Sequence, residues 1–299
     1  MSNGWSWYVI VITVLNVFCW FWLLWWARTK RVADTSKGAT LGHAYDGIEE
    51  LDLPLPRWWL WMFIGTIIFA IGYLIAYPGL GNFPGLLGWT SHGQWAQAVA
   101  ADDAKYGPIY AAYEKEGIPD LGKNRQAMEM GQRLFANNCA RCHGSDARGG
   151  PGFPNLTDND WLFGGAPEQI QLSILNGRNG IMPAFAPALG GEENVDNVVA
   201  YVRSLSGLPS DAAKAAKGKE QFVVICAACH GPEGKGNQII GAPNLTDNIW
   251  LFGSSPDTIK EGLRMGRSSM MPAHADILGP AKAHVVAAYV YSLSNNGTN

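Results

Sequence analysis

Two long apolar runs stand near the start of the chain. The first, residues 5–27, is apolar apart from a few positions such as Ser6 and Asn16, and its 23 residues (27 − 5 + 1) would form a helix ~35 Å long. The second run begins at the pair Trp58-Trp59 and ends at Pro78. Because the hydrocarbon core of a bilayer is ~30 Å thick, we predict that both runs cross a membrane.

The charges that flank the first run argue against a cleaved signal peptide. Such a peptide begins with basic residues, and residues 1–4 contain neither Lys nor Arg. The loop between the runs instead carries the basic residues Arg28, Lys30, Arg31, Lys37 and Arg57. The positive-inside rule then places this loop in the cytoplasm. We therefore predict a multi-pass protein of a bacterial inner membrane whose N-terminus, and whose chain after residue 78, are periplasmic.

The chain repeats itself after residue 125. The sequence Cys139-Ala140-Arg141-Cys142-His143 returns as Cys226-Ala227-Ala228-Cys229-His230, at an offset of 87 (226 − 139). Met182-Pro183 returns as Met271-Pro272 at an offset of 89 (271 − 182), so the second copy has a two-residue insertion. Each copy ends in a helical pattern, at 198–205 and 285–293. Two copies of this length predict two tandem domains, at 126–207 and 211–296.

The remaining residues divide into three parts. Residues 1–57 hold the first transmembrane helix (about 5–27) and the cytoplasmic loop, and residues 58–78 form the second transmembrane helix. Residues 79–125 belong to neither anchor nor repeat; an amphipathic helix is expected from Gln94 to Tyr106, limited by Pro108. This segment either links the anchor to the first domain or docks a partner. The fold class expected for the whole chain is all-α.

The repeated Cys-x-x-Cys-His motif is typical of covalent haem c attachment. Cysteines three apart on a helical turn share one face, so both sulfurs can bond the two vinyl groups of one haem. The following histidine then falls beneath the ring and binds the iron. We predict two haem c groups attached through Cys139, Cys142, Cys226 and Cys229, with His143 and His230 as axial ligands.

Two other readings of the cysteine pairs are a thioredoxin-like redox pair and half of a zinc site. The first would follow a strand, and no strand pattern surrounds the motifs; the second requires four ligands per site. Neither explains the Met-Pro that follows at a matched distance in both repeats. The fifth cysteine, Cys19, lies inside an apolar run, where packing is the expected role.

The two repeated methionines are the candidate sixth ligands. Met182 follows His143 by 39 residues (182 − 143), and Met271 follows His230 by 41 (271 − 230). A thioether ligand raises the reduction potential and leaves no open position, which suits electron transfer rather than oxygen or peroxide chemistry. The spacing pairs each methionine with the histidine of its own repeat. His274 is a rival ligand, although Phe185 holds the equivalent place in the first repeat.

Other repeated residues are expected to support the two sites. The carbonyls of Pro154 and Pro243 are positioned to accept the proton of the second ring nitrogen of each histidine. Candidates for bonding a haem propionate, or for packing on the ring, are Asn155, Trp161, Asn244 and Trp250. The formal net charge of −3 argues against a nucleic-acid partner.

Segments outside the repeats also carry a resemblance. Residues 42–50, 54–59, 77–81 and 88–91 are similar to signatures of the dihaem subunit III of cbb3-type cytochrome c oxidases, and with the repeats the likeness covers nearly the whole chain. The resemblance implies two class I cytochrome c domains behind a membrane anchor. It also implies that electrons from a soluble cytochrome c, or another donor, pass by way of a monohaem cytochrome c subunit to a haem–copper catalytic subunit. That subunit reduces oxygen and pumps protons.

The chain itself is expected to contain no catalytic site. Three other functions remain open: a dihaem shuttle for another reductase, a dihaem peroxidase, and a structural or assembly role. We further expect the second haem to face the donor, so that removal of residues 211–299 abolishes donor oxidation while the complex still assembles.

Overall fold

The computed structural model describes residues 1–29, 40–51 and 56–295, in two compact units that cover residues 1–103 and 104–299. The predicted cytoplasmic charges Lys30, Arg31 and Lys37 lie outside the described residues. Each unit is considered by itself.

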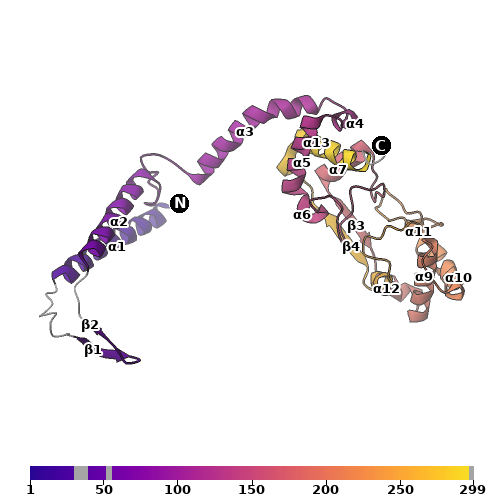
Figure 1. Cartoon of the computed structure of the whole chain (residues 1–299), viewed down its shortest axis with the longest axis horizontal. Helices are drawn as coiled ribbons and strands as arrows, with labels where there is room; N and C mark the ends of the chain where they lie inside the picture. The colour runs from indigo at the N-terminus through magenta and orange to yellow at the C-terminus, as the bar shows by residue number, and fades with distance from the viewer. Residues whose placement is uncertain (30–39, 52–55, 296–299) are drawn as a thin grey trace. The chain divides into compact units, whose positions relative to one another are not determined.

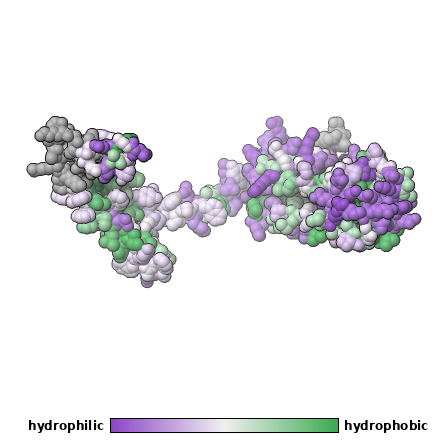
Figure 2. Space-filling view, turned by 90° about the horizontal axis from the view of Figure 1, so that it is seen from below, coloured by the Kyte–Doolittle hydropathy of each residue, from purple (hydrophilic) through white to green (hydrophobic). Residues whose placement is uncertain are grey.

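The first unit contains two long apolar helices, α1 (Asn3–Thr29) and α2 (Arg57–Ala76). Both are long and apolar enough to cross a membrane, as the sequence predicts. Their large side chains are mostly exposed: Trp7 is 66% exposed and Phe69 is 72% exposed. Figure 2 shows the hydrophobic surface gathered on this part of the molecule. Because soluble proteins rarely expose apolar surface so extensively, these helices are suited to lipid.

Polar and aromatic contacts connect the two apolar helices. The rings of Trp20 and Phe63 meet edge-on with centroids 6.0 Å apart. Beyond the end of α2, the backbone N–H of Asn82 donates to Ser6 Oγ over 2.9 Å. Ser6 is buried, so this hydrogen bond satisfies a polar group that α1 would otherwise leave unpaired in an apolar setting.

A hairpin of β1 (Thr40–Tyr45) and β2 (Ile48–Leu51) lies between α1 and α2 in the sequence. Its turn is Asp46-Gly47, and both residues have positive φ (52° and 83°), the geometry that tight hairpins require. The strands are a departure from the all-α expectation. The Asp-Gly pair was the available signal for them in the sequence.

Helix α3 (Ser91–Tyr113) runs through Pro108 and corrects the expected end of this helix near Tyr106. A proline inside a helix removes one N–H donor, so only one intrahelical hydrogen bond, to the carbonyl of Ala104, is lost directly. Tyr110 and Tyr113 are buried in the last turn. Their packing therefore extends the helix beyond the proline.

The second unit is built mostly of helices (Figure 1). They are α4 (Ile118–Leu121), α5 (Arg125–Asn138), α6 (Ala140–His143), α7 (Pro167–Asn176), α8 (Ala186–Leu189), α9 (Glu192–Leu205), α10 (Ala212–Ile225), α11 (Ala227–His230), α12 (Pro256–Met265) and α13 (Ala275–Asn295). Helix α13 is kinked at Gly279. Two short strands, β3 (Arg178–Met182) and β4 (Arg267–Met271), complete the unit.

Two hydrophobic cores lie inside this unit, and each combines segments of both repeats. In the first core, α13 from the second repeat packs on α4, α5 and α7 from the first part. In the second core, α9 from the first repeat packs on α10 and α12. Figure 1 shows these two groups with β3 and β4 between them. The cores therefore cross the boundary at residues 207–211 that the repeat predicts.

Strands β3 and β4 pair antiparallel and connect the two cores. Their register places Arg178 opposite Met271, Gly180 opposite Ser269, and Met182 opposite Arg267. The outer pairs are equivalent under the repeat offset of 89 (267 − 178), so the ribbon is nearly two-fold symmetric about its centre. Backbone pairing between the repeats carries each Met-Pro segment away from its own histidine. This pairing is the physical reason for the exchange of segments.

The close crossing of α5 and α13 gives a stability prediction. A Cβ atom at Gly131 would lie 2.7 Å from Tyr289 Cβ and 3.0 Å from the carbonyl oxygen of Val285. Since α13 must then move away from α5, we expect Gly131→Ala to lower the free energy of unfolding by about 1–3 kcal/mol. Thermal unfolding of the detergent-solubilised chain measures this change. Gly107→Ala is the matched control, because a Cβ there meets nothing within 4 Å; equal effects of the two substitutions would contradict the prediction.

Candidate haem-binding sites

Both Cys-x-x-Cys-His motifs adopt the same local structure. Cys139 ends α5 and Cys226 ends α10, and in each case a single helical turn carries the second cysteine and the histidine. Cys142 and Cys229 are exposed, so each motif turns one sulfur inward and the other to the surface. This arrangement can hold one edge of a flat group at the mouth of a pocket.

The inward cysteines are poor candidates for thiol redox chemistry. Burial raises the pKa of the Cys139 thiol to about 11, and the neighbouring Cys142 adds to the effect. Burial likewise raises the pKa of the Cys226 thiol to about 11. A thiol of a redox pair instead needs a lowered pKa, because the thiolate is the nucleophile. This contrast disfavours the thioredoxin-like alternative.

Each motif histidine is oriented by a proline carbonyl, as the sequence predicts. His143 Nδ1 lies 3.1 Å from Pro154 O, and His230 Nδ1 lies 3.1 Å from Pro243 O. A carbonyl only accepts, so Nδ1 carries the proton and Nε2 keeps its lone pair for a metal. Burial lowers the pKa of both histidines. The imidazoles are therefore neutral near pH 7, which is the form that binds iron.

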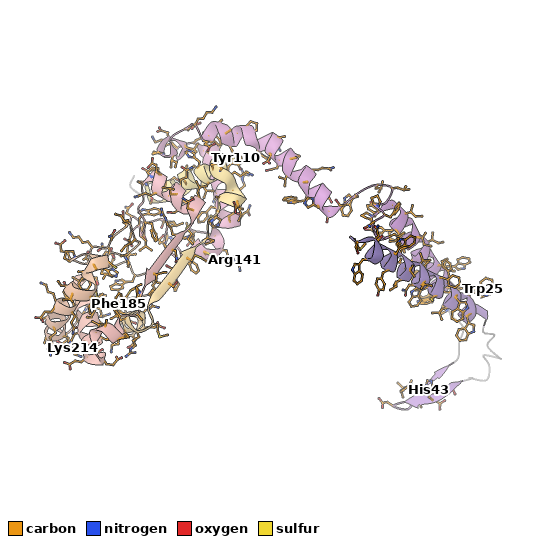
Figure 3. All side chains as sticks on the ribbon, turned by 180° about the vertical axis from the view of Figure 1, so that it is seen from behind. Trp25, His43, Tyr110, Arg141, Phe185 and Lys214 are labelled. Carbon is orange, nitrogen blue, oxygen red and sulfur yellow. The ribbon has the colours of Figure 1, made fainter. Side chains whose placement is uncertain are left out.

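The two methionines lie in the opposite cores from those that the sequence spacing indicates. Met271 packs in the first core with Cys139, Leu156 and Trp161. Met182 packs in the second core and lines the same pocket as Cys226, Cys229 and His230. In Figure 3, Arg141 of the first motif and Phe185, which follows Met182, lie well apart. The geometry therefore brings His143 together with Met271, and His230 together with Met182.

The residues of the second pocket fit a haem group. Apolar side chains form its walls: Val198, Val202, Phe222, Ile225, Leu245, Ile259 and Leu263. Trp250 also lines the pocket, and its buried Nε1–H has no hydrogen-bond partner among the described residues. Because a buried donor without an acceptor is costly, this N–H is suited to a ligand acceptor such as a haem propionate. The Nε1–H of Trp250 is therefore the atom that we expect to bond a haem propionate.

Asn155 and Asn244 stabilise turns within their own loops. Asn155 Oδ1 accepts from the backbone N–H of Thr157 over 2.9 Å and from its hydroxyl over 2.8 Å. Asn244 makes the same pair of bonds with Thr246, at 3.0 and 2.8 Å. These bonds shape the loops that present Pro154 and Pro243. The amide oxygens are therefore engaged in turns rather than directed to a ligand.

His274 lies in the first site. It is close enough to His143 to lower the pKa of that imidazole, although burial is the larger cause. Met271 and His274 thus enter the same core from the Met-Pro segment of the second repeat. Within residues 1–29, 40–51 and 56–295, no three His, Cys, Asp or Glu side chains gather as a metal cluster. The described residues therefore offer no set of ligands for a zinc ion.

Three carboxylates, Asp158 and Asp160 in the first repeat and Asp247 in the second, predict how the stability of the fold depends on pH. Burial, together with the charges of Asp247 and Asp158, raises the pKa of Asp160 to about 6. The folded chain therefore holds a proton that the unfolded chain, with a carboxyl pKa near ~3.9, releases. Stability should fall as the pH rises from ~4 to ~6. Because Asp160 is only partly buried, screening limits the cost at pH 7 to ~1 kcal/mol.

We accordingly expect Asp160→Asn to stabilise the chain at pH 7.5 and to flatten this pH dependence. Thermal unfolding at pH 4.5 and 7.5 is the measurement. Asp257→Asn, at an exposed position, is the control. An unchanged pH dependence in Asp160→Asn would show that another group causes the effect.

Two arginines at the sites were missed by the sequence interpretation. Arg178 begins β3 and Arg267 begins β4, each directly after a glycine with positive φ. Their common offset of 89 (267 − 178) matches that of the methionines. Extending the repeat comparison by four residues before each methionine would have found them.

Comparisons with known proteins show which families and relatives the chain is similar to. A family model described as cytochrome C oxidase, cbb3-type, subunit III matches residues 126–202 and 213–290. A second, described as the N-terminal domain of cytochrome oxidase-cbb3, FixP, matches residues 37–84. The cbb3-type cytochrome c oxidase subunit CcoP of Rubrivivax gelatinosus is 49% identical over 99% of this chain and 97% of its own length. The subunit FixP of Azorhizobium caulinodans is 42% identical over 85% of this chain and 92% of its own.

Proposed function

Since this chain belongs to the family of subunit III of the cbb3-type cytochrome c oxidases, we propose that it binds two haem c groups covalently and relays electrons between them. The chain is a membrane-anchored electron-transfer subunit of an oxidoreductase complex and contains cytochrome c domains. The number of haems, their ligands and the partners are the proposal.

The first haem is held by Cys139 and Cys142, and the second by Cys226 and Cys229. His143 and Met271 would hold the first iron, and His230 and Met182 would hold the second. One observation carries this assignment: the first cysteine of each motif, Cys139 or Cys226, shares a core with the methionine of the other repeat. Bound haem iron supplies one-electron chemistry.

Residues of the chain orient the histidine ligands, exclude water and limit access to the iron. The proline carbonyls fix the tautomer of each imidazole, so that Nε2 faces the metal. The apolar walls exclude water, which favours the less charged, reduced state. The thioethers of Met182 and Met271 would bind the irons and so limit the access of oxygen and peroxide.

We infer the chain's partners from its family, and its orientation in the membrane from the charges of the sequence. A soluble cytochrome c, or another donor, reduces this chain on the periplasmic side. The monohaem cytochrome c subunit and the haem–copper catalytic subunit receive the electrons. The basic loop between the two spans supports a cytoplasmic position for residues 28–57, and hence a periplasmic one for the N-terminus and both haem sites.

Three measurements on the native, detergent-solubilised chain test the proposal. Mass spectrometry should give the added mass of two haem groups, and the spectrum should be six-coordinate and low-spin. The chain should co-purify with a haem–copper subunit. A five-coordinate, high-spin haem would favour a peroxidase, and purification without a haem–copper subunit would overturn the oxidase role.

A further inference from the structure

Each haem site has a repeated arginine beside its methionine. Met182 is paired with Arg267 across the β3–β4 ribbon, and Met271 is paired with Arg178. Directly opposite residues of an antiparallel pair lie on the same face, with Cβ atoms about 4.5–5.5 Å apart. The alternating burial of both strands turns this face inward, while Ile181 and Met270 point outward at 68% and 76% exposure.

The guanidinium of Arg267 is fixed in the second pocket. It lines that pocket together with Met182 and His230. Its Nη2 donates to the carbonyl of Thr258 over 2.7 Å, and its Cζ lies 4.6 Å from the ring centroid of Phe252. Glu261 approaches Nη2 to 3.6 Å, but that carboxylate is 64% exposed whereas the Arg267 side chain is 25% exposed. The positive charge is therefore held in place and only partly neutralised.

Arg178 repeats this arrangement at the other end of the ribbon. Its Nε donates to Ser173 Oγ over 2.8 Å, and its Nη2 donates to the carbonyl of Gln169 over 3.3 Å. Its Cζ lies 5.1 Å from the ring centroid of Phe163. Both arginines thus combine a carbonyl of the preceding helix with an aromatic face. A common scheme at both ends indicates a role in the site rather than an isolated surface contact.

We propose that Arg267 and Arg178 are positioning residues that each hold a permanent positive charge beside the methionine ligand of one haem and so raise its reduction potential. A guanidinium stays protonated at any accessible pH, so this charge is constant. Where solvent is partly excluded, a nearby cation disfavours the oxidised, more positive iron. The same cation can pair with a haem carboxylate, as the unpartnered Trp250 N–H can. The inference rests on the proposed function, since it requires both haems.

The alternative is that the arginines only clamp the ribbon to the helices. Two substitutions separate these roles: Arg267→Gln removes the charge, while Arg267→Lys keeps it and loses the planar stacking on Phe252. We expect Gln to shift the midpoint potential of the second haem downward and leave the first unchanged, and Lys to restore most of the shift. Spectroelectrochemical titration of the full, solubilised chain is the measurement. Equal shifts in Gln and Lys, or no shift in Gln, would overturn the proposal.

Further variants keep the test decisive. Arg178→Gln should shift the first haem alone, and Arg125→Gln, at a side chain 93% exposed, should shift neither. If Arg267→Gln fails to fold, Glu261→Gln provides the test, because it removes the negative charge beside Arg267. The midpoint potential of the second haem should then rise, and a fall in that potential would contradict the proposal. Mass spectrometry accompanies each variant. Absence of two haems in the unaltered chain would overturn the proposed function, whereas unchanged potentials with both haems present would overturn only this inference.

Discussion

Replacing Met271 with alanine is expected to open the sixth position of the haem that Cys139 and Cys142 hold, rather than that of the nearer haem in the sequence. Met271 packs in the first core, with Cys139 and Trp161. The chain should therefore lose the spectral signature of methionine–iron ligation from one of its two haems, or about half of that signal. The potential of the affected haem should fall, because a thioether ligand raises it.

A single-haem background identifies which iron is affected. Cys226→Ala combined with Cys229→Ala leaves only the first attachment motif intact. In that background, Met271→Ala should abolish the remaining methionine signal, whereas Met182→Ala should leave it unchanged. Met270→Ala is the matched control, since its side chain is adjacent but 76% exposed. If Met182→Ala removes the signal instead, each methionine serves its own repeat and the crossed assignment is wrong.

Removing residues 211–299 is expected to destroy the first haem site as well as the second. The sequence alone predicts that this truncation abolishes donor oxidation while the complex still assembles. In the structure, α13 forms part of the first core, where Val285 and Val286 are fully buried. Burial of two such side chains stabilises by roughly 3–6 kcal/mol, which is comparable with the ~5–15 kcal/mol that keeps a domain folded. The truncated chain also lacks Met271.

Limited proteolysis and haem content of the truncated chain measure this effect. We expect rapid cleavage within residues 126–176 and little retained haem. A chain that ends after Asn295 keeps α13 and is the matched control, expected to be resistant. A protease-resistant truncated chain with a six-coordinate first haem would show that the first repeat folds by itself.

Local features of the structure could be predicted from local sequence. The apolar runs gave both candidate spans, because a span needs only length and composition. The Cys-x-x-Cys-His motifs predicted the helical turns that carry the second cysteine and the histidine. The repeated prolines predicted the hydrogen bonds of His143 to Pro154 and of His230 to Pro243. In each case the residues concerned belong to one short, continuous stretch of the sequence.

The pairing of methionines with histidines could not be predicted in the same way. Met182-Pro183 and Met271-Pro272 stand in nearly identical settings, so each suits either pocket equally well. The choice is made by backbone pairing between β3 and β4, two segments 89 residues apart (267 − 178). Backbone hydrogen bonds leave little trace in side-chain patterns. The packing of Tyr110 and Tyr113, which extends α3 past Pro108, likewise involves a core that includes residues of α13, far away in the sequence.

Helix α13 lies at the C-terminal end of the chain and yet forms part of the first core. During synthesis, the residues around Cys139 emerge well before α13 exists. The first core therefore forms only when residues about 150 positions apart (285 − 135) come together, and such long-range contacts form slowly. Until α13 has been exported, Cys139 and Cys142 therefore lie outside a completed core. A chain whose synthesis stops before α13 thus lacks a finished first centre, whereas the second core contains no residue of α13.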